Sequence, residues 1–295
     1  MPSRSVPARS FHLHLVSDAT GETLSTVARA CVAQFPGAEA VEHMWSLVRT
    51  QGQVQRVLTG IRAHPGVVLC TIVDRPLREQ LETGCRSLGV PCSFVLAPAL
   101  NTLAAYLGQA IHGRPGGQHE MNEEYYRRIE AMEYTLAHDD GHGTPNLERA
   151  DVVLVGVSRT SKTPTCLYLA NRGLKAANVP LVPNVPLPAF LLTATKPLIV
   201  GLTTDAARLV QIRRNRLSQF GDAAAVSTYA NLEDVRAELA TARRLCQEHG
   251  WPVIDVSRRS IEETAAAIYQ LYVDRLERQS EAAPGGAVVG MATPP

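Results

Sequence analysis

Short apolar segments alternate with amphipathic ones along the chain, and this alternation predicts an α/β fold built from parallel-sheet units with crossover helices. In the first part of the chain, strand-like segments lie at residues 11–16, 41–48, 66–74 and 91–97. Helix-like stretches lie between them, near residues 21–34, 51–63 and 76–88. Strands that alternate with helices in this way favour right-handed crossovers in one sheet.

A second α/β unit is predicted after a loop rich in Gly and Pro at 111–120 and a helix at 122–137 that begins at the N-cap residue Asn122. Its strands are expected at 152–156, 198–202 and 252–256. Its helices are expected at about 163–177, 204–218, 231–249 and 260–276. Ser260 and Glu263 form a capping box at the start of the last helix.

These patterns divide the chain into four predicted regions. Residues 11–148 form an N-terminal α/β domain with a connecting helix, and residues 149–277 form a P-loop-like nucleotide-binding domain. Residues 1–10 and 278–295 lack periodicity, and the second of these segments is rich in Ala, Gly and Pro. Both are expected to be disordered.

Composition narrows the class of protein. The 295 residues carry a formal net charge of +1, so charge gives no reason to expect binding to nucleic acid or to a membrane surface. No apolar run approaches the length of a membrane span, and no apolar segment follows the two N-terminal arginines as a signal peptide requires. The six cysteines form no CxxC pair. We expect reduced thiols in a cytoplasmic protein.

The segment Gly156-Val157-Ser158-Arg159-Thr160-Ser161-Lys162-Thr163 predicts a phosphate-binding loop. It follows the strand at 152–155, and Pro164 suits the first turn of the next helix. In such loops backbone N–H groups and the helix N-terminus hold phosphate oxygens, a lysine reaches the phosphates, and a Ser/Thr hydroxyl binds Mg²⁺. Lys162 and Thr163 occupy the last two roles.

One position departs from the usual pattern of such loops. Ser161 stands where a second glycine is expected, and its Cβ would make a positive φ costly. The loop could therefore deviate from the usual shape of nucleoside triphosphatases. The alternative is a polar strand-to-helix turn with a surface lysine.

Three further groups carry weaker signals. The segment 17–23, which contains Asp18, also follows a strand and opens a helix, which fits either a ligand site or simple capping. His138, Asp139 and Asp140 could perform acid–base work or hold a metal, but a solvated loop is the favoured interpretation. Asp74 and Asp255 each end a strand, which is common and gives only a weak indication of function. For His12 and His14, packing or solvent exposure is favoured over catalysis.

Four segments together resemble the bacterial pyruvate, phosphate dikinase regulatory proteins. They are FHLHLVSDATGETL (11–24), PGGQHEMNEEYYRRIEAMEYTLAHDDG (115–141), ADVVLVGVSRTSKTPTCLYLANRGLKAANVPLVP (150–183) and WPVIDVSRRSIEETAAAI (251–268). The resemblance covers about residues 11–277, and the stretch from Gly156 is its most specific part. Ser161 resembles the dikinase branch, whereas a sister branch that acts on phosphoenolpyruvate synthase has CGK at 160–162. Ala19 and Ser257 differ mildly from the family pattern, which has Ser and Thr there.

The resemblance implies a bifunctional serine/threonine kinase and phosphorylase. Such a protein uses ADP to phosphorylate a threonine of the dikinase, which inactivates that enzyme. It removes the phosphate with inorganic phosphate and releases pyrophosphate. Pyruvate, phosphate dikinase is the expected protein partner, and a homodimer is compatible with the sequence.

Within this interpretation each candidate residue has a role. Residues 156–163 would hold the ADP phosphates, and Lys162 would neutralise charge on the transferred group. Thr163 would bind Mg²⁺ if a metal is used, and Asp18 or Asp140 would be the base. Three alternatives stay open: the same chemistry on phosphoenolpyruvate synthase, a small-molecule P-loop kinase, and a nucleotide sensor without catalysis.

Overall fold

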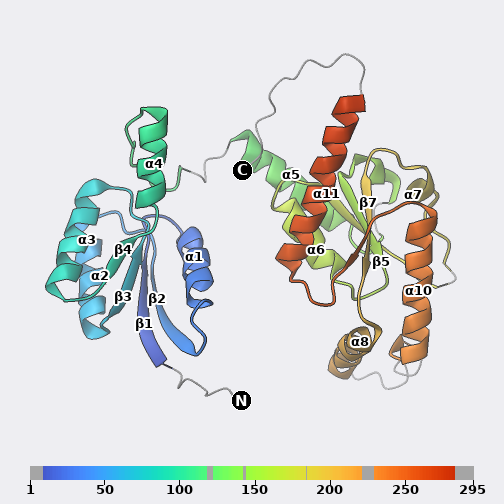
Figure 1. The fold of residues 1–295 in the computed structure, drawn as a ribbon, viewed down its shortest axis with the longest axis horizontal. Helices are drawn as coiled ribbons and strands as arrows, with labels where there is room; N and C mark the ends of the chain where they lie inside the picture. The colour runs from blue at the N-terminus through green and yellow to red at the C-terminus, as the bar shows by residue number, and fades with distance from the viewer. Residues whose placement is uncertain (1–8, 118–121, 142–143, 184, 221–228, 283–295) are drawn as a thin grey trace, which may run out of the picture. The chain divides into compact units, whose positions relative to one another are not determined.

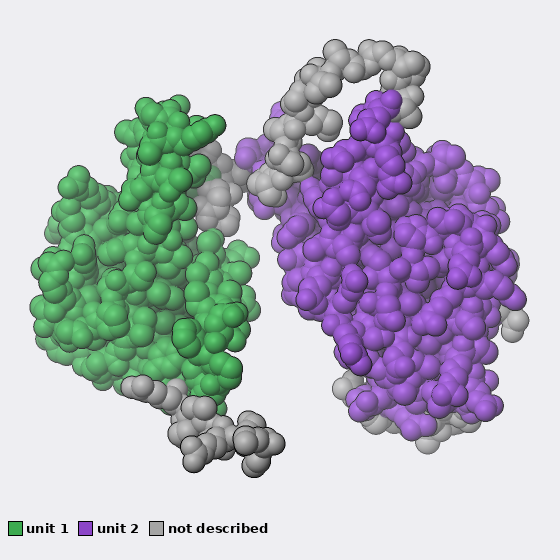
Figure 2. All heavy atoms as spheres, in the orientation of Figure 1, with its two compact units in different colours: residues 1–120 green, residues 121–295 purple. Residues whose placement is uncertain are grey.

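The computed structural model describes residues 9–117, 122–141, 144–183, 185–220 and 229–282. The chain divides into two compact units, residues 1–120 and 121–295, which Figure 2 colours separately. Each unit is α/β and contains its own four-stranded parallel sheet, as the sequence predicts (Figure 1). Within the described residues, no helix is both long and apolar enough to cross a bilayer.

Unit 1 is a parallel sheet with the strand order β2-β1-β3-β4. Its elements are β1 (Arg9–Val16), α1 (Glu22–Val32), β2 (Ala38–Trp45), α2 (Gln51–Ala63), β3 (Gly66–Cys70), α3 (Arg75–Ser87), β4 (Cys92–Phe94) and α4 (Ala97–Leu107). Helices α2 and α3 pack on one face of the sheet, where Val54 and Leu81 are completely buried. Helix α1 covers the other face with Leu24 and Ala28.

Unit 2 repeats this strand order as β6-β5-β7-β8. Its elements are α5 (Glu123–Ala137), the 3-10 helix η2 (Thr144–Arg149), β5 (Val152–Gly156), α6 (Lys162–Ala170), β6 (Ala176–Pro180), α7 (Ala189–Thr193), β7 (Leu198–Thr203), α8 (Ala206–Phe220), α10 (Leu232–Glu248), β8 (Val253–Asp255) and α11 (Ile261–Ala282). Helices α6 and α11 pack on one face. The other face packs against η2, α7 and the Tyr134 side chain of α5, while α8 and α10 pack against Val157.

Both expected helix caps are present. The Asn122 side chain accepts a hydrogen bond from the Tyr125 backbone N–H, and α5 begins one residue later. The Ser260 Oγ accepts from the Glu263 N–H at 3.1 Å, while the Glu263 carboxylate accepts from the Ser260 N–H at 2.9 Å. This reciprocal pair is the capping box that the sequence predicts for α11.

The observed elements differ from the expected ones in several places. The helix expected over 163–177 ends at Ala170, and its last two residues, the buried Ala176 and Ala177, begin strand β6. The strand expected over 91–97 is shorter in the structure, because β4 ends at Phe94. Helix α4 begins at Ala97 and was not expected from the sequence.

The observed boundaries differ too. The units separate after residue 120 rather than after 148, because α5 packs on α6 and β6. Residues 9–10 belong to β1, and 278–282 belong to α11, so these parts of the expected disordered ends are ordered. The remaining parts of both ends, 1–8 and 283–295, lie outside the described residues.

Candidate functional site

The carboxyl ends of the two central strands of each sheet are the places to look for a site. The chain runs from β1 to β2 on one side and then crosses over to β3 on the other side of β1, and β5 lies between β6 and β7 in the same way. In open parallel sheets, ligands bind at such switch points, outside the carboxyl ends of the strands. The segment after β5 is the candidate phosphate loop, and the segment after β1 contains Asp18.

The loop at 156–163 connects β5 directly to α6 and carries unusual backbone angles. Gly156 has a φ of 154°, and a Cβ there would lie 2.5 Å from the Leu202 carbonyl oxygen, so a glycine is required. Arg159 has a φ of 74° and Ser161 has a φ of 60°. Ser161 thus adopts the left-handed conformation usually given to glycine, at the N-cap of α6 and with no side-chain cap. Strain of this kind concentrates at functional sites.

The Lys162 side chain is buried against its own loop, with 5% of its surface exposed. Its Nζ donates to the Val157 carbonyl oxygen at 2.9 Å, and Thr160 Oγ1 donates to the same oxygen at 3.0 Å. Burial lowers the pKa of Lys162 to about 8, against the opposing effect of the nearby Asp140 carboxylate. Its ammonium is therefore close to titration at neutral pH.

Asp139, rather than Asp140, contacts the loop hydroxyl. Thr163 Oγ1 donates to Asp139 Oδ1 at 2.9 Å. The Asn178 amide on β6 donates to Asp139 Oδ1 at 2.7 Å, to Asp140 Oδ1 at 3.2 Å and to Thr163 Oγ1 at 3.1 Å. Asp140 has a φ of 50°, the left-handed region that Asp tolerates better than most residues. The structure thus brings both carboxylates to the loop.

His138 lies in the same segment but is buried, with 6% of its surface exposed. Its Nδ1 donates to the Tyr134 carbonyl at 2.7 Å, and its ring stacks on Tyr134 with the centroids 3.9 Å apart. Its Nε2 is buried and has no hydrogen-bond partner among the residues that the structure describes. His138 is therefore packed and Asp139 is partly buried, whereas Asp140 is exposed, so the solvated loop that the sequence favoured is correct only for Asp140.

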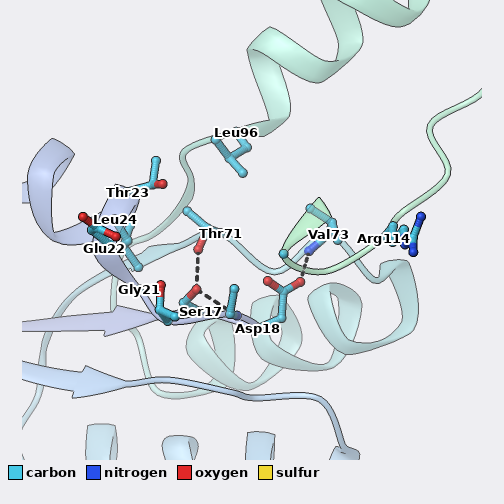
Figure 3. A pocket seen from close by; sticks show the side chains of 13 residues that line it. Ser17, Asp18, Gly21, Glu22, Thr23, Leu24, Thr71, Val73, Leu96 and Arg114 are labelled. Carbon is cyan, nitrogen blue, oxygen red and sulfur yellow. Dashed lines mark hydrogen bonds between the residues drawn. The ribbon is translucent and has the colours of Figure 1, made fainter. Parts of the chain in front are cut away.

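Asp18 lies in unit 1, at a cavity of about 250 Å³ at the carboxyl ends of β1 and β3 (Figure 3). Its Oδ2 accepts from the Val73 backbone N–H at 2.8 Å, and burial raises its pKa. Ser17 Oγ accepts from Thr71 Oγ1 at 3.0 Å, and Arg114 lines the same cavity. A buried carboxyl group whose pKa is raised is suited to acid–base work.

Three further aspartates, which end or follow strands, have local structural partners. Asp74 caps α3 by accepting from the Leu77 N–H at 3.0 Å, and Asp205 accepts from the Arg208 N–H at 2.9 Å. Asp255 accepts from the Ser257 hydroxyl and backbone N–H, and the hydroxyl contact lowers its pKa.

The two strand histidines, His12 and His14, pack within unit 1. The His14 ring stacks on that of His43, and the His12 ring packs at a tilt against the rings of His43 and His64. This is the packing role that the sequence favoured.

Sequence reasoning missed three residues around the loop: Asp139 as the Thr163 partner, Asn178 and Arg213. The sequence did point to Asp139, because this residue belongs to the candidate segment 138–140. No sequence pattern pointed to Asn178 or Arg213, since each contacts residues 15 to 55 positions away that only the fold brings close. No group of three or more His, Cys, Asp or Glu suited to a metal occurs in the described part of the chain.

Comparisons with known proteins identify relatives over most of the chain. The profile of the kinase/pyrophosphorylase family matches residues 13–269. A protein of Paramagnetospirillum magneticum named as a pyruvate, phosphate dikinase regulatory protein is 54% identical over 275 residues, 93% of this chain and 88% of its own length. Proteins with the same name from Bradyrhizobium diazoefficiens and Brucella anthropi are 53% identical over 90% of this chain and 95% and 96% of their own lengths.

Proposed function

Because the chain belongs to the kinase/pyrophosphorylase family, we propose that it regulates pyruvate, phosphate dikinase by reversible phosphorylation. In one direction it transfers the β-phosphoryl group of ADP to a threonine of the dikinase. In the other it removes that group with inorganic phosphate. The observation that carries the proposal is the strand–loop–helix segment at 156–163, with strained backbone and a buried lysine.

The loop suits the phosphates of a nucleoside diphosphate. Its N–H groups and the N-terminus of α6 offer donors and positive potential to phosphate oxygens. Lys162 adds an ammonium where negative charge develops in the transition state. Thr163 and Asp139 present hydroxyl and carboxylate oxygens, the donors that Mg²⁺ prefers, so these two residues would hold that ion. Bound there, Mg²⁺ would neutralise phosphate charge.

One carboxyl group can act as the base in the kinase reaction and as the acid in the phosphorylase reaction. In the kinase direction the threonine oxygen bonds to the β-phosphorus, the bond to the bridging oxygen of ADP breaks, and AMP leaves while a carboxylate takes the hydroxyl proton. In the phosphorylase direction a phosphate oxygen attacks the phosphothreonine phosphorus, and the threonine oxygen leaves with a proton. Pyrophosphate is the product. Asp18 and Asp140 are the proposed carboxylates.

The test is a reaction with the dikinase and ADP that contains no ATP. We expect the dikinase to gain the mass of one phosphate and an equal amount of AMP to accumulate, measured by mass spectrometry and chromatography. A requirement for ATP, with ADP as product, would contradict the proposed donor. Nucleotide turnover without the dikinase would indicate a small-molecule kinase, and inhibition without a mass gain would indicate a sensor.

The same assay with phosphoenolpyruvate synthase separates the two protein targets. The names of the relatives favour the dikinase. We therefore expect no mass gain on the synthase under conditions that modify the dikinase. Modification of the synthase alone would reassign the target and leave the chemistry intact.

A further inference from the structure

Arg213 on α8 is the largest of the fully buried side chains among the described residues, with 1% of its surface exposed. A guanidinium stays charged at any ordinary pH, so its burial must be compensated by an acidic partner and hydrogen bonds. Glu238 on α10 provides the partner. Arg213 Nη2 lies 2.7 Å from Glu238 Oε2, and Nη1 lies 3.2 Å from Oε1, which is a two-point contact.

The remaining contacts of Arg213 lead to the phosphate loop. Its Nη2 donates to the Ser158 carbonyl oxygen at 3.3 Å, and its Nη1 donates to the Tyr229 carbonyl oxygen at 2.9 Å. The guanidinium carbon lies 4.4 Å from the centroid of the Tyr229 ring. The Tyr229 hydroxyl in turn lies 3.2 Å from Ser158 Oγ. Ser158 is therefore held at its backbone by Arg213 and at its side chain by Tyr229.

The loop needs such support. Arg159, directly after Ser158, and Ser161 both have left-handed backbone angles without being glycine. Conformations of this kind persist when the surroundings over-determine them. Val157, directly before Ser158, is buried against Leu209 of α8 and Val235 of α10, the same two helices that supply Arg213 and Glu238. Packing and hydrogen bonds thus fix consecutive loop residues against one helix pair.

Arg213 does not serve as a phosphate ligand, because it is buried and its charge is paired with Glu238. We propose that the Arg213–Glu238 pair and Tyr229 form a positioning group that holds Ser158, and with it the loop 156–163, in the conformation that binds ADP. This inference rests on the proposed role of the loop. Its consequence is that nucleotide affinity depends on side chains that never touch the nucleotide.

The experiment measures ADP affinity by calorimetry, together with KM, kcat and the melting temperature. Tyr229→Phe removes only the hydroxyl contact to Ser158, and we expect ADP affinity to fall about fivefold, the effect of one hydrogen bond, with an unchanged melting temperature. The double variant Arg213→Met/Glu238→Leu removes the pair without leaving an unpaired buried charge, so folding should survive. We expect it to weaken ADP binding by about tenfold or more and to raise KM for ADP more than it lowers kcat.

Arg275→Met is the matched control. Arg275 also donates to two backbone carbonyls, those of Pro197 and Thr195, but at the amino end of β7, away from the loop. It should leave ADP affinity unchanged. Wild-type affinity in both folded Tyr229→Phe and the double variant would overturn the positioning role. Wild-type protein that binds no ADP, or binds it equally well after Lys162→Ala, would instead overturn the proposed function of the loop.

Discussion

The contacts of Lys162 define what this residue can do. Its Nζ lies 2.9 Å from the Val157 carbonyl oxygen of the same loop, so a short movement would bring its ammonium to a phosphate bound there. Arg159 is the neighbouring loop cation, but its side chain is exposed. The lysine is therefore the cation whose position the loop itself fixes.

Lys162→Ala should abolish phosphorylation of the dikinase while leaving the protein folded. The reason is that the transferred phosphoryl group loses its fixed positive charge, which acts most strongly in a site shielded from water. The measurement is phosphate incorporation, with circular dichroism to check the fold. Near-normal activity in a folded variant would end the phosphate-loop hypothesis.

The same lysine should make ADP binding depend on pH. Burial lowers its pKa to about 8, so the ammonium that attracts phosphate loses its proton as pH rises through that value. We expect ADP affinity to fall between about pH 7 and pH 9, measured by calorimetry. Lys162→Arg keeps a positive charge throughout this range. Its ADP affinity can differ from that of the wild type but should not change with pH. Equal pH profiles for both proteins would contradict this assignment.

At the scale of elements, most strands and helices could be predicted because their apolar periodicity is local. Strand β6 could not, because Ala176 and Ala177 favour helices in isolation. Small side chains are needed there for packing: α5 and α6 lie against this strand, and Thr135 Oγ1 donates to the Ala176 carbonyl at 2.8 Å. Tertiary packing thus overrides intrinsic propensity. The turn before β6 contains Gly173 with a φ of 79°, which was the available sequence signal.

Strands β1 and β2 also place three imidazoles together, those of His12, His14 and His43. The imidazole of His64, at the end of α2, joins them. His12 Nδ1 lies 2.9 Å from His43 Nε2, His14 Nε2 donates to the His64 carbonyl at 2.8 Å, and the Trp45 indole donates to His14 Nδ1 at 3.2 Å. Burial, followed by the neighbouring imidazoles, lowers the pKa of His14 and His43. The folded state therefore disfavours protonation of His14 and His43.

We expect unit 1 to lose stability as the pH falls below about 6.5, the ordinary pKa of histidine. Because the pKa of His14 and His43 is lower in the folded state, the unfolded chain binds more protons in this range, and stability decreases with decreasing pH. Thermal unfolding followed from pH 7.5 to pH 5 should show the decrease. His43→Gln should reduce it, whereas His249→Gln, outside the cluster, should not. A decrease of the same size in His43→Gln would contradict the assignment.

At the scale of the whole molecule, the two units share one strand order and each has its candidate site at the same topological position. This could not be predicted from the sequence, because the segments at 17–23 and 156–163 differ in length and residue type. The strand–loop–helix arrangement at 156–163 could be predicted, since its residues are contiguous. Its supporting residues could not, because Asn178 and Arg213 reach it only through folding.

The two proposed carboxylates lie in different units, Asp18 in unit 1 and Asp140 in unit 2. A threonine hydroxyl is a poor nucleophile until a base takes its proton, and the departing threonine oxygen needs a proton in the reverse reaction. One carboxyl group that changes protonation state serves both directions. The raised pKa of the buried Asp18 favours it for this exchange, whereas Asp140 belongs to the same unit as the loop and is a Coulombic neighbour of Lys162.

Asp18→Asn or Asp140→Asn should therefore slow both reactions by about a hundredfold or more, the lower end of a general acid–base contribution. ADP affinity should survive, because residues 156–163 are unchanged. Both variants are assayed in both directions, with Asp74→Asn as the control, since Asp74 caps α3. A loss in one direction only would mean that the two reactions use different proton carriers. Wild-type rates in both variants would reduce Asp18 and Asp140 to structural roles and make Asp139, the partner of Thr163, the next carboxylate to test.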